Sequence, residues 1–179
     1  DDVFVFFDTK GDYIAQFFRE GDLSLSPNTD SEHQGAVLWN LFAELADVSA
    51  GDLPETVREI VGSLMDVSDD DHNRIWVAMA ADLVTALIVA YARTGKRYTN
   101  ADIRAMADSL TTQQIREILA GHRDLRGAAQ YIAKDGSTTT TSVMIFVQQT
   151  LRQVFAGAFR KRGDFSVRDF LRGKGSRAL

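Results

Sequence analysis

Apolar residues recur every three or four positions along most of this chain, from about residue 36 to residue 161. This spacing predicts roughly seven or eight amphipathic helices with short connections. Polar residues that cap free backbone amides stand at most of the expected helix starts. One helix is expected over residues 37–45, and the two longest, over residues 75–92 and from about residue 137 to residue 161, are expected to form the core. The predicted fold is therefore mainly α, a multi-helix bundle.

The N-terminal residues follow a different pattern. Residues 3–7 are all apolar, which predicts a strand in a sheet covered on both faces. A helix capped by Asp12 and a second strand over residues 23–26, ended by Pro27, would complete a small βαβ unit. Two strands cannot make a buried sheet. We therefore expect this unit to be the edge of a larger α/β domain into which the helical bundle is inserted.

The expected domain boundaries follow from this reading. Residues 1–27 would be the edge of the parent α/β domain, residues 28–162 the all-α domain, and residues 163–179 the segment that returns to the parent domain.

Charge is distributed unevenly along the 179 residues. The net charge is −5, yet residues 1–72 hold 17 acidic and 3 basic side chains, whereas residues 73–179 hold 8 acidic and 17 basic ones. The second half could therefore bind a polyanion although the whole chain, with its net negative charge, could not.

The chain has no cysteine, which excludes disulfides and thiolate metal sites and suits a cytoplasmic protein. The apolar run over residues 75–92 carries Asp82 and Thr85, so we expect a core helix and no membrane contact.

Patterns that would indicate catalysis are incomplete. Thr94-Gly95-Lys96 lacks the glycine at position 90 and the hydroxyl at position 97 that a nucleotide-binding P-loop needs. The apolar run that ends at Asp8 has Lys10 where an aspartyl-phosphate hydrolase would have a second acid. The acidic residues 69–71 suit a helix start, and none of the three histidines has metal-ligand spacing. We therefore predict no catalytic and no metal-binding residue.

Cations near a hydroxyl-rich helix start form the candidate binding site. Three arginines surround the break at Gly121, and a lysine precedes the run of serines and threonines at residues 137–142. Such a helix start, next to cations, can bind phosphate. Ordinary solvated charge and redundant helix caps would give the same pattern. The candidate DNA-binding residues are Arg116, Arg123, Arg126, Lys134, Ser137 and Thr138.

Three segments of the chain resemble motifs of type IV coupling proteins, the ring-forming ATPases that deliver DNA or protein to conjugation and secretion channels. The first is a strand followed by Asp-Thr-Lys-Gly-Asp, the second joins Leu-Ser-Leu-Ser-Pro to Trp-Asn-Leu-Phe-Ala-Glu-Leu, and the third is Gly-Asp-Phe-Ser-Val-Arg-Asp-Phe-Leu. Their order and spacing span most of the chain. The positions that carry the resemblance are Asp8, Lys10, Gly11, Asp12, Pro27, Trp39, Asn40, Phe165 and Ser166.

The resemblance implies a specific context. Members of the family have a RecA-like ATPase domain interrupted by an all-α domain that faces substrate at the cytoplasmic mouth of a homohexameric ring, anchored at the cell membrane. This chain would be the all-α domain with its flanking edges, without the Walker motifs and thus without ATP hydrolysis. ATP and Mg²⁺ would be cofactors of the parent protein alone. The partner would be DNA, a relaxase-type protein, or both; a protein-docking adaptor without DNA binding and a free-standing helical regulator are the alternatives.

Overall fold

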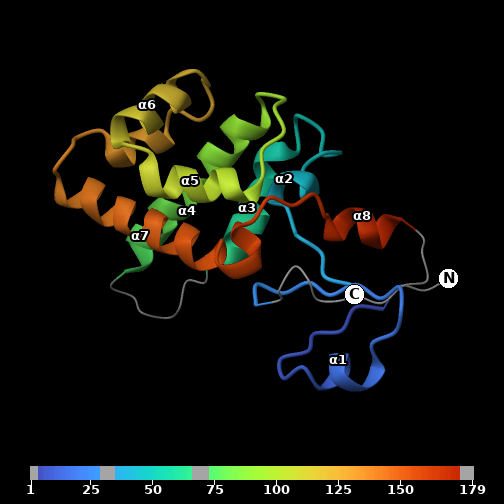
Figure 1. Cartoon of the computed structure of the whole chain (residues 1–179). Coiled ribbons are helices and arrows are strands. Elements are labelled where there is room, and N and C mark those ends of the chain that lie inside the picture. Colours follow the sequence, from blue (N-terminus) through green and yellow to red (C-terminus); the bar gives the residue numbers. More distant parts are fainter. Residues whose placement is uncertain (1–3, 29–34, 66–72, 174–179) are drawn as a thin grey trace.

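The computed structural model of the protein describes residues 4–28, 35–65 and 73–173. Within these residues the chain forms eight α-helices and two short 3-10 helices, and no regular strand (Figure 1). The prediction of a mainly α fold is therefore confirmed. In chain order the elements are α1 (Asp12–Phe17), α2 (Leu41–Glu44), α3 (Leu53–Leu64), α4 (Arg74–Ala92), α5 (Asn100–Ser109), α6 (Thr112–Ala120), η1 (Ala128–Ile132), α7 (Thr138–Val154), η2 (Gly157–Arg160) and α8 (Val167–Arg172).

Helix α4 is the centre of the bundle. It packs against α3 and α7 along its length and also contacts α6 and η1. Leu83 and Val89 on this helix are fully buried. Among the described residues, α4 is the one helix long and apolar enough to cross a membrane, but half of its apolar stretch is buried within the bundle. Burial, and then the charge of Asp82 in the middle of α4, raise the pKa of the Tyr131 hydroxyl on η1. These contacts are those of a core helix.

Local capping signals place most of the helix starts. Thr99 and Thr111 form capping boxes at the starts of α5 and α6, and Ser137 and Ser166 accept hydrogen bonds from backbone amides of α7 and α8. These starts were predicted from the sequence. The expected beginning of the core helix near residues 68–69, with the acidic run at 69–71, lies outside the described residues.

The predicted N-terminal strand does not form a regular strand within residues 4–7. The aromatic side chains of this segment are exposed, Phe7 by 95%. Phe6 stacks on Tyr13 with ring centroids 4.9 Å apart, and Tyr13 in turn lies 5.2 Å from Phe17. A run of apolar residues becomes a buried strand only when neighbouring strands supply the hydrogen bonds and cover both faces. The described part of the chain supplies neither.

The turn before α1 is organised by Asp8, and the prediction that Asp12 caps this helix is wrong. The Asp8 carboxylate accepts hydrogen bonds from the backbone amides of Gly11, Tyr13 and Ile14 at 2.9–3.1 Å. These bonds, the one from Ile14 foremost, lower the pKa of Asp8. Gly11 occupies the cap position with a φ of 79°, a left-handed conformation that glycine adopts without strain. Asp12 is the first residue of α1, and the backbone amide of Lys10 also reaches Asp8 at 3.3 Å.

Two predicted helices are shorter than expected because tertiary contacts hold the residues at one end of each in a non-helical conformation. The segment ahead of α2 is extended, and α2 begins only at Leu41, because Ala36 and Trp39 form parallel bridges with Ser24 and Phe165. Helix α7 stops at Val154, and a separate 3-10 turn follows. The predicted strand over residues 23–26 is reduced to the single bridge at Ser24.

Candidate nucleic-acid interface

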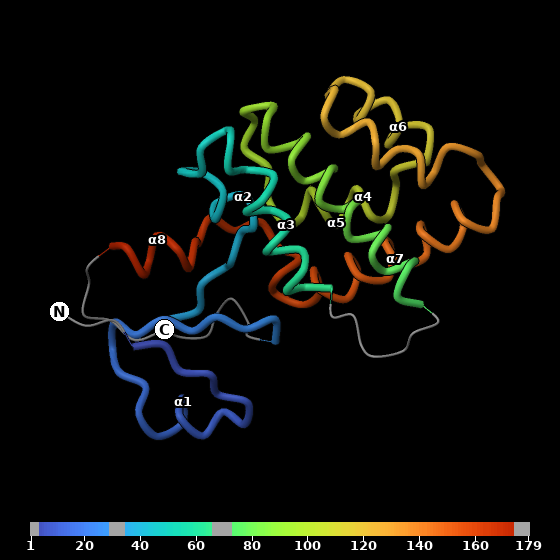
Figure 2. The backbone as a smooth tube through the Cα atoms, turned by 180° about the vertical axis from the view of Figure 1, so that it is seen from behind, coloured from blue at the N-terminus to red at the C-terminus, as the bar shows by residue number. Residues whose placement is uncertain are grey.

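The predicted binding residues all lie at one end of the bundle, which we call the distal end and define as residues 112–138. It comprises α6, η1 and the start of α7. Figures 1 and 2 show it from opposite sides, and in both views it is at the far end of the bundle from α8 and α1. Helix α6 and the start of α7 meet there because both pack on η1, whose Ala128 and Ile132 are buried.

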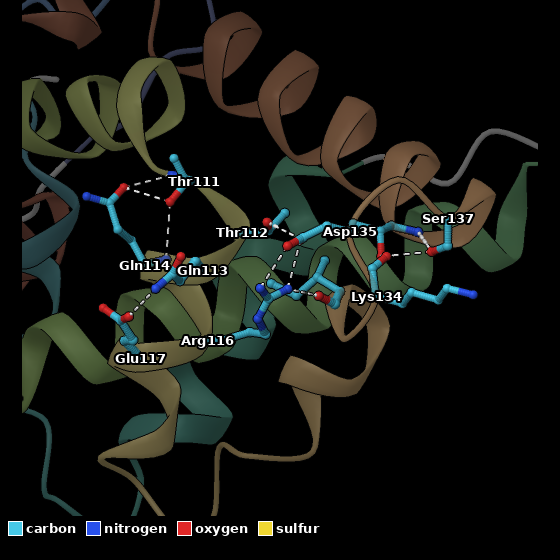
Figure 3. Close-up of polar contacts among 11 residues, drawn as sticks. Thr111, Thr112, Gln113, Gln114, Arg116, Glu117, Lys134, Asp135 and Ser137 are labelled. Atoms are coloured by element: carbon cyan, nitrogen blue, oxygen red, sulfur yellow. Dashed lines mark hydrogen bonds and ion pairs between the residues drawn. The ribbon is translucent and has the colours of Figure 1, made fainter.

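Arg116 is engaged within the protein. Its guanidinium donates to both carboxylate oxygens of Asp135 at 2.9 and 3.0 Å and to the carbonyl oxygen of Ile132 at 2.6 Å (Figure 3). The hydroxyl of Thr112 donates to the same carboxylate at 2.5 Å. Arg116 and Thr112 lower the pKa of Asp135 to about 2. This network ties α6 to the segment ahead of α7, so Arg116 has a structural role in the free domain.

The Asp135 carboxylate should make stability at low pH depend on this network. A carboxyl group whose pKa is lower in the folded state than the usual value of about 3.9 stabilises the fold above that value, and the contribution disappears as the pH falls through about 2. We expect Asp135→Asn to lower the free energy of unfolding at neutral pH, and its difference from wild type to shrink between about pH 4 and pH 2. Urea denaturation at several pH values across this range measures the difference in the free energy of unfolding. Asp47→Asn, at an exposed carboxylate outside this network, is the control for the loss of one acidic charge. A pH-independent difference between Asp135→Asn and wild type would contradict the assignment.

The start of α7 is capped by its own side chains. The Ser137 hydroxyl accepts from the amide of Thr140 at 3.2 Å, and the Thr140 hydroxyl donates to the carbonyl oxygen of Lys134 at 2.8 Å. Thr138 is exposed at the first helical position. Asp135 adds a carboxylate next to this helix start. The hydroxyls predicted to bind phosphate are therefore in place, but the Ser137 hydroxyl, which would have to donate to a phosphate oxygen, already donates to the Thr140 hydroxyl at 3.0 Å.

Three cations remain available to solvent at the distal end. Arg123 and Lys134 are exposed, and among the described residues neither side chain forms an ion pair. Arg126 is exposed and uses only its Nε, which donates to the carbonyl oxygen of Ala120 at 3.0 Å. Figure 3 shows the Lys134 side chain extending away from the Arg116–Asp135 pair. Two of the three acids of the distal end form ion pairs, Asp124 with an arginine outside it and Asp135 with Arg116, whereas Glu117 is exposed and accepts a hydrogen bond from Gln113.

Four motif residues, Trp39, Asn40, Phe165 and Ser166, lie at the opposite end, in a part that we call the neck and define as residues 36–44 together with residues 157–168. Here the incoming and outgoing segments of the helical body run side by side. The amide of Asn40 donates to the carbonyl oxygen of Phe165 at 2.9 Å, and the amide of Phe165 donates to the carbonyl oxygen of Leu38 at 3.1 Å. Trp39 stacks on Phe155 at the end of α7, with ring planes 5° apart.

A buried carboxylate joins the two segments of the neck. Glu44 is only 8% exposed. It accepts hydrogen bonds from the indole N–H of Trp39 at 2.9 Å and the hydroxyl of Ser166 at 2.9 Å. It also accepts from the backbone amides of Val167 and Arg168 at 2.6 and 3.0 Å, the first amides of α8. A carboxylate at a helix N-terminus satisfies amides that have no partner within the helix.

Asn100 holds the incoming segment from the side of the bundle. It is fully buried, and its amide group accepts from the backbone N–H of Leu41 at 2.9 Å and donates to the carbonyl oxygen of Trp39 at 2.8 Å. Asn40 caps α2 and donates to the carbonyl oxygen of Tyr98 at 3.2 Å. The sequence did not predict that Glu44 and Asn100 hold the neck together; Asn100 was expected only as an alternative to Thr99 for the cap of α5. The signal that could have found Glu44 is an acid in an otherwise apolar helical segment, a position that needs several hydrogen-bond donors.

Comparison with known proteins identifies the family. A family model described as the type IV secretion-system coupling protein DNA-binding domain matches residues 1–178. The chain belongs to this family. Neither a curated protein nor a solved structure matches the chain. The family match confirms the resemblance drawn from the sequence motifs and supports DNA as a partner of this coupling-protein domain.

Proposed function

We propose that this coupling-protein domain is inserted into a RecA-like ATPase domain through the neck and meets DNA with its distal end. The observation that carries the proposal is the position of these two parts at opposite ends of one bundle (Figures 1 and 2). An inserted domain needs its two connections close together. The parallel bridge between Trp39 and Phe165 provides this closeness.

The exposed aromatic segment supports the same arrangement. Phe4, Phe6 and Tyr13 present apolar rings to solvent next to α1. Contiguous exposed apolar surface of this kind normally marks a surface that another part of a protein covers. In the proposal, residues 1–27 and 163–179 belong to the parent RecA-like domain, whose sheet would cover this segment. ATP and Mg²⁺ would bind in that domain, and this chain would not hydrolyse ATP.

The distal end has the charge that phosphate binding requires. Arg123, Arg126 and Lys134 are exposed, and the acids nearest to them in sequence are paired with other arginines. A few phosphate contacts give weak binding that does not depend on base sequence. In a homohexamer at the cytoplasmic entrance of a secretion channel, six copies would multiply this affinity.

The proposal is tested with the double variant Arg123→Gln/Arg126→Gln. We expect it to bind a short mixed-sequence DNA duplex about fivefold to tenfold more weakly than wild type, and the slope of log K against log salt to fall by about 1.8, because each lost duplex phosphate contact removes about 0.9. Fluorescence anisotropy over a series of KCl concentrations measures both quantities. The matched control is Lys10→Gln/Arg19→Gln, which removes the same charge from two exposed positions around α1.

Three results discriminate between the possible functions. Weaker binding in the distal variant but not in the control supports the proposal. Equal loss in both variants would mean that binding follows net charge alone, and the distal site would be rejected. Unchanged DNA affinity in the distal variant, together with a salt-tolerant complex with a relaxase-type protein, would favour the protein-docking function instead.

A further inference from the structure

The loop between α4 and α5, residues 93–99, carries two exposed cations that the proposed DNA site does not include. Lys96 and Arg97 are exposed, and among the described residues neither side chain forms an ion pair. The loop contains no acidic residue. Thr94-Gly95-Lys96 does not complete a nucleotide-binding P-loop, so Lys96 and Arg97 have no role assigned from the sequence.

The loop has a defined turn that fixes where these cations stand. The Thr94 hydroxyl donates to the carbonyl oxygen of Tyr91 at 2.9 Å and accepts from the backbone amide of Lys96 at 3.2 Å. Gly95 has a φ of 70°, a left-handed conformation that a side chain would strain. Lys96 and Arg97 therefore follow a closed turn, which reduces the backbone entropy that DNA binding would cost.

An ion pair joins this loop to the distal end. The guanidinium of Arg93 donates to both carboxylate oxygens of Asp124 at 2.9 and 2.8 Å. The pair lowers the pKa of Asp124 and raises the pKa of Arg93. Asp124 is the sequence neighbour of Arg123 and the only acid in residues 121–127. In Figures 1 and 2 the α4–α5 loop and the loop after α6 lie along the same upper edge of the bundle.

We propose that Lys96 and Arg97 extend the DNA interface across the Arg93–Asp124 pair, so that the two loops contact backbone phosphates side by side. This inference rests on the proposed function and adds a second contact region to it. The one acid of the two loops is neutralised by its arginine, which leaves Lys96, Arg97, Arg123 and Arg126 as a cationic edge. Phosphates are the ligand that such an edge fits.

The edge offers charge but no exposed phenylalanine, tyrosine or tryptophan ring for base stacking, and the imidazole of His122 is half-buried. Tyr98 is half-buried, and its ring packs 5.5 Å from that of Phe42 and 4.9 Å edge-on from that of Tyr91. Proteins that prefer single strands combine positive charge with exposed aromatic side chains on which bases stack. The edge should therefore bind duplex DNA at least as tightly as a single strand of equal length, and without sequence preference.

The test compares Lys96→Gln/Arg97→Gln with Arg123→Gln/Arg126→Gln, the quadruple variant and the Lys10→Gln/Arg19→Gln control. We expect each loop pair to weaken duplex binding about fivefold to tenfold and to reduce the salt slope by about 1.8, with the two losses adding in the quadruple variant. Thermal melting followed by circular dichroism checks that all variants keep the wild-type fold, as expected for exposed side chains.

The outcomes separate this inference from the proposed function. If Lys96→Gln/Arg97→Gln binds duplex like wild type while Arg123→Gln/Arg126→Gln does not, the extended edge is wrong and the distal site stands. If neither pair changes the affinity, both are wrong. A clear preference for single-stranded DNA in the wild-type domain would also overturn the inference, because the edge exposes no phenylalanine, tyrosine or tryptophan ring on which bases would stack.

Discussion

Replacing Phe155 by alanine is expected to lower the free energy of unfolding by about 3–5 kcal/mol, the cost of deleting a fully buried aromatic side chain. Phe155 is 1% exposed, and its ring lies parallel to that of Trp39 with centroids 6.3 Å apart. It therefore packs the end of α7 against the neck. Losing it removes both the buried area and the ring contact, and the surrounding backbone is too constrained by hydrogen bonds to fill the cavity. Urea denaturation followed by circular dichroism measures the change.

Ile145 in α7 provides the control for Phe155, which caps the C-terminal end of that helix. Its side chain is 55% exposed, so Ile145→Ala should cost less than about 1 kcal/mol. Leu83→Ala in the centre of α4 should cost about 2–5 kcal/mol, because Leu83 is fully buried. Equal effects at Phe155 and Ile145 would mean that the core is not where the structure places it.

The helices could be predicted because their signals are local. The spacing of apolar residues is sufficient to identify α3 and α4, and capping residues such as Thr99 and Ser166 mark helix starts within three residues of the amides they bind. Each signal depends on the chain immediately around it. Such local signals show where a helix begins and which of its faces is apolar, although packing supplies most of its stability, so sequence reasoning identifies these helices well.

The boundaries that sequence reasoning missed are set by distant partners. Residues 37–40 have helical spacing, but backbone hydrogen bonds to Phe165 hold them extended. The end of α7 is fixed by Pro27, whose carbonyl oxygen accepts from the amide of Ala158 at 2.7 Å. Gly157 permits this contact with a φ of 52°. Residues more than a hundred positions apart make these bonds, and no local pattern indicates them.

The candidate site, like the fold, could be predicted from the sequence only in part. The presence of cations at the distal end could be predicted from sequence, but which of them are free could not. Arg116 and Arg93 are each paired with an acid that lies 19 and 31 residues further along the chain. The basic half of the chain is therefore partly neutralised from within, and the exposed set is smaller than the sequence count suggests. Only the arrangement of the loops distinguishes a paired arginine from an available one.

The neck should be intolerant of any side chain at Gly163. A Cβ atom placed there would lie 2.1 Å from the carbonyl oxygen of Leu38 and 2.7 Å from the Leu38 Cβ. A Cβ has no rotamer by which to move away, so the outgoing segment would have to separate from the incoming one. The separation would break the hydrogen bonds between Phe165 and its partners and draw α8 away from Glu44. We expect Gly163→Ala to destabilise the domain by about 3 kcal/mol, the upper end of the range for overpacking.

Gly62→Ala is the matched control, because the same methyl group is added where no atom lies within 4 Å. Gly62 is inside α3, where alanine is favoured over glycine by about 0.5–1 kcal/mol, so this variant should be more stable than wild type. Urea denaturation measures both variants. Hydrogen exchange at the amides of Val167 and Arg168 then shows whether the neck has opened, because these amides lose protection only if α8 separates from Glu44. Stabilisation of similar size at Gly163 and Gly62 would show that the two segments of the neck are not in contact, and the geometric argument for an inserted domain would lose its basis.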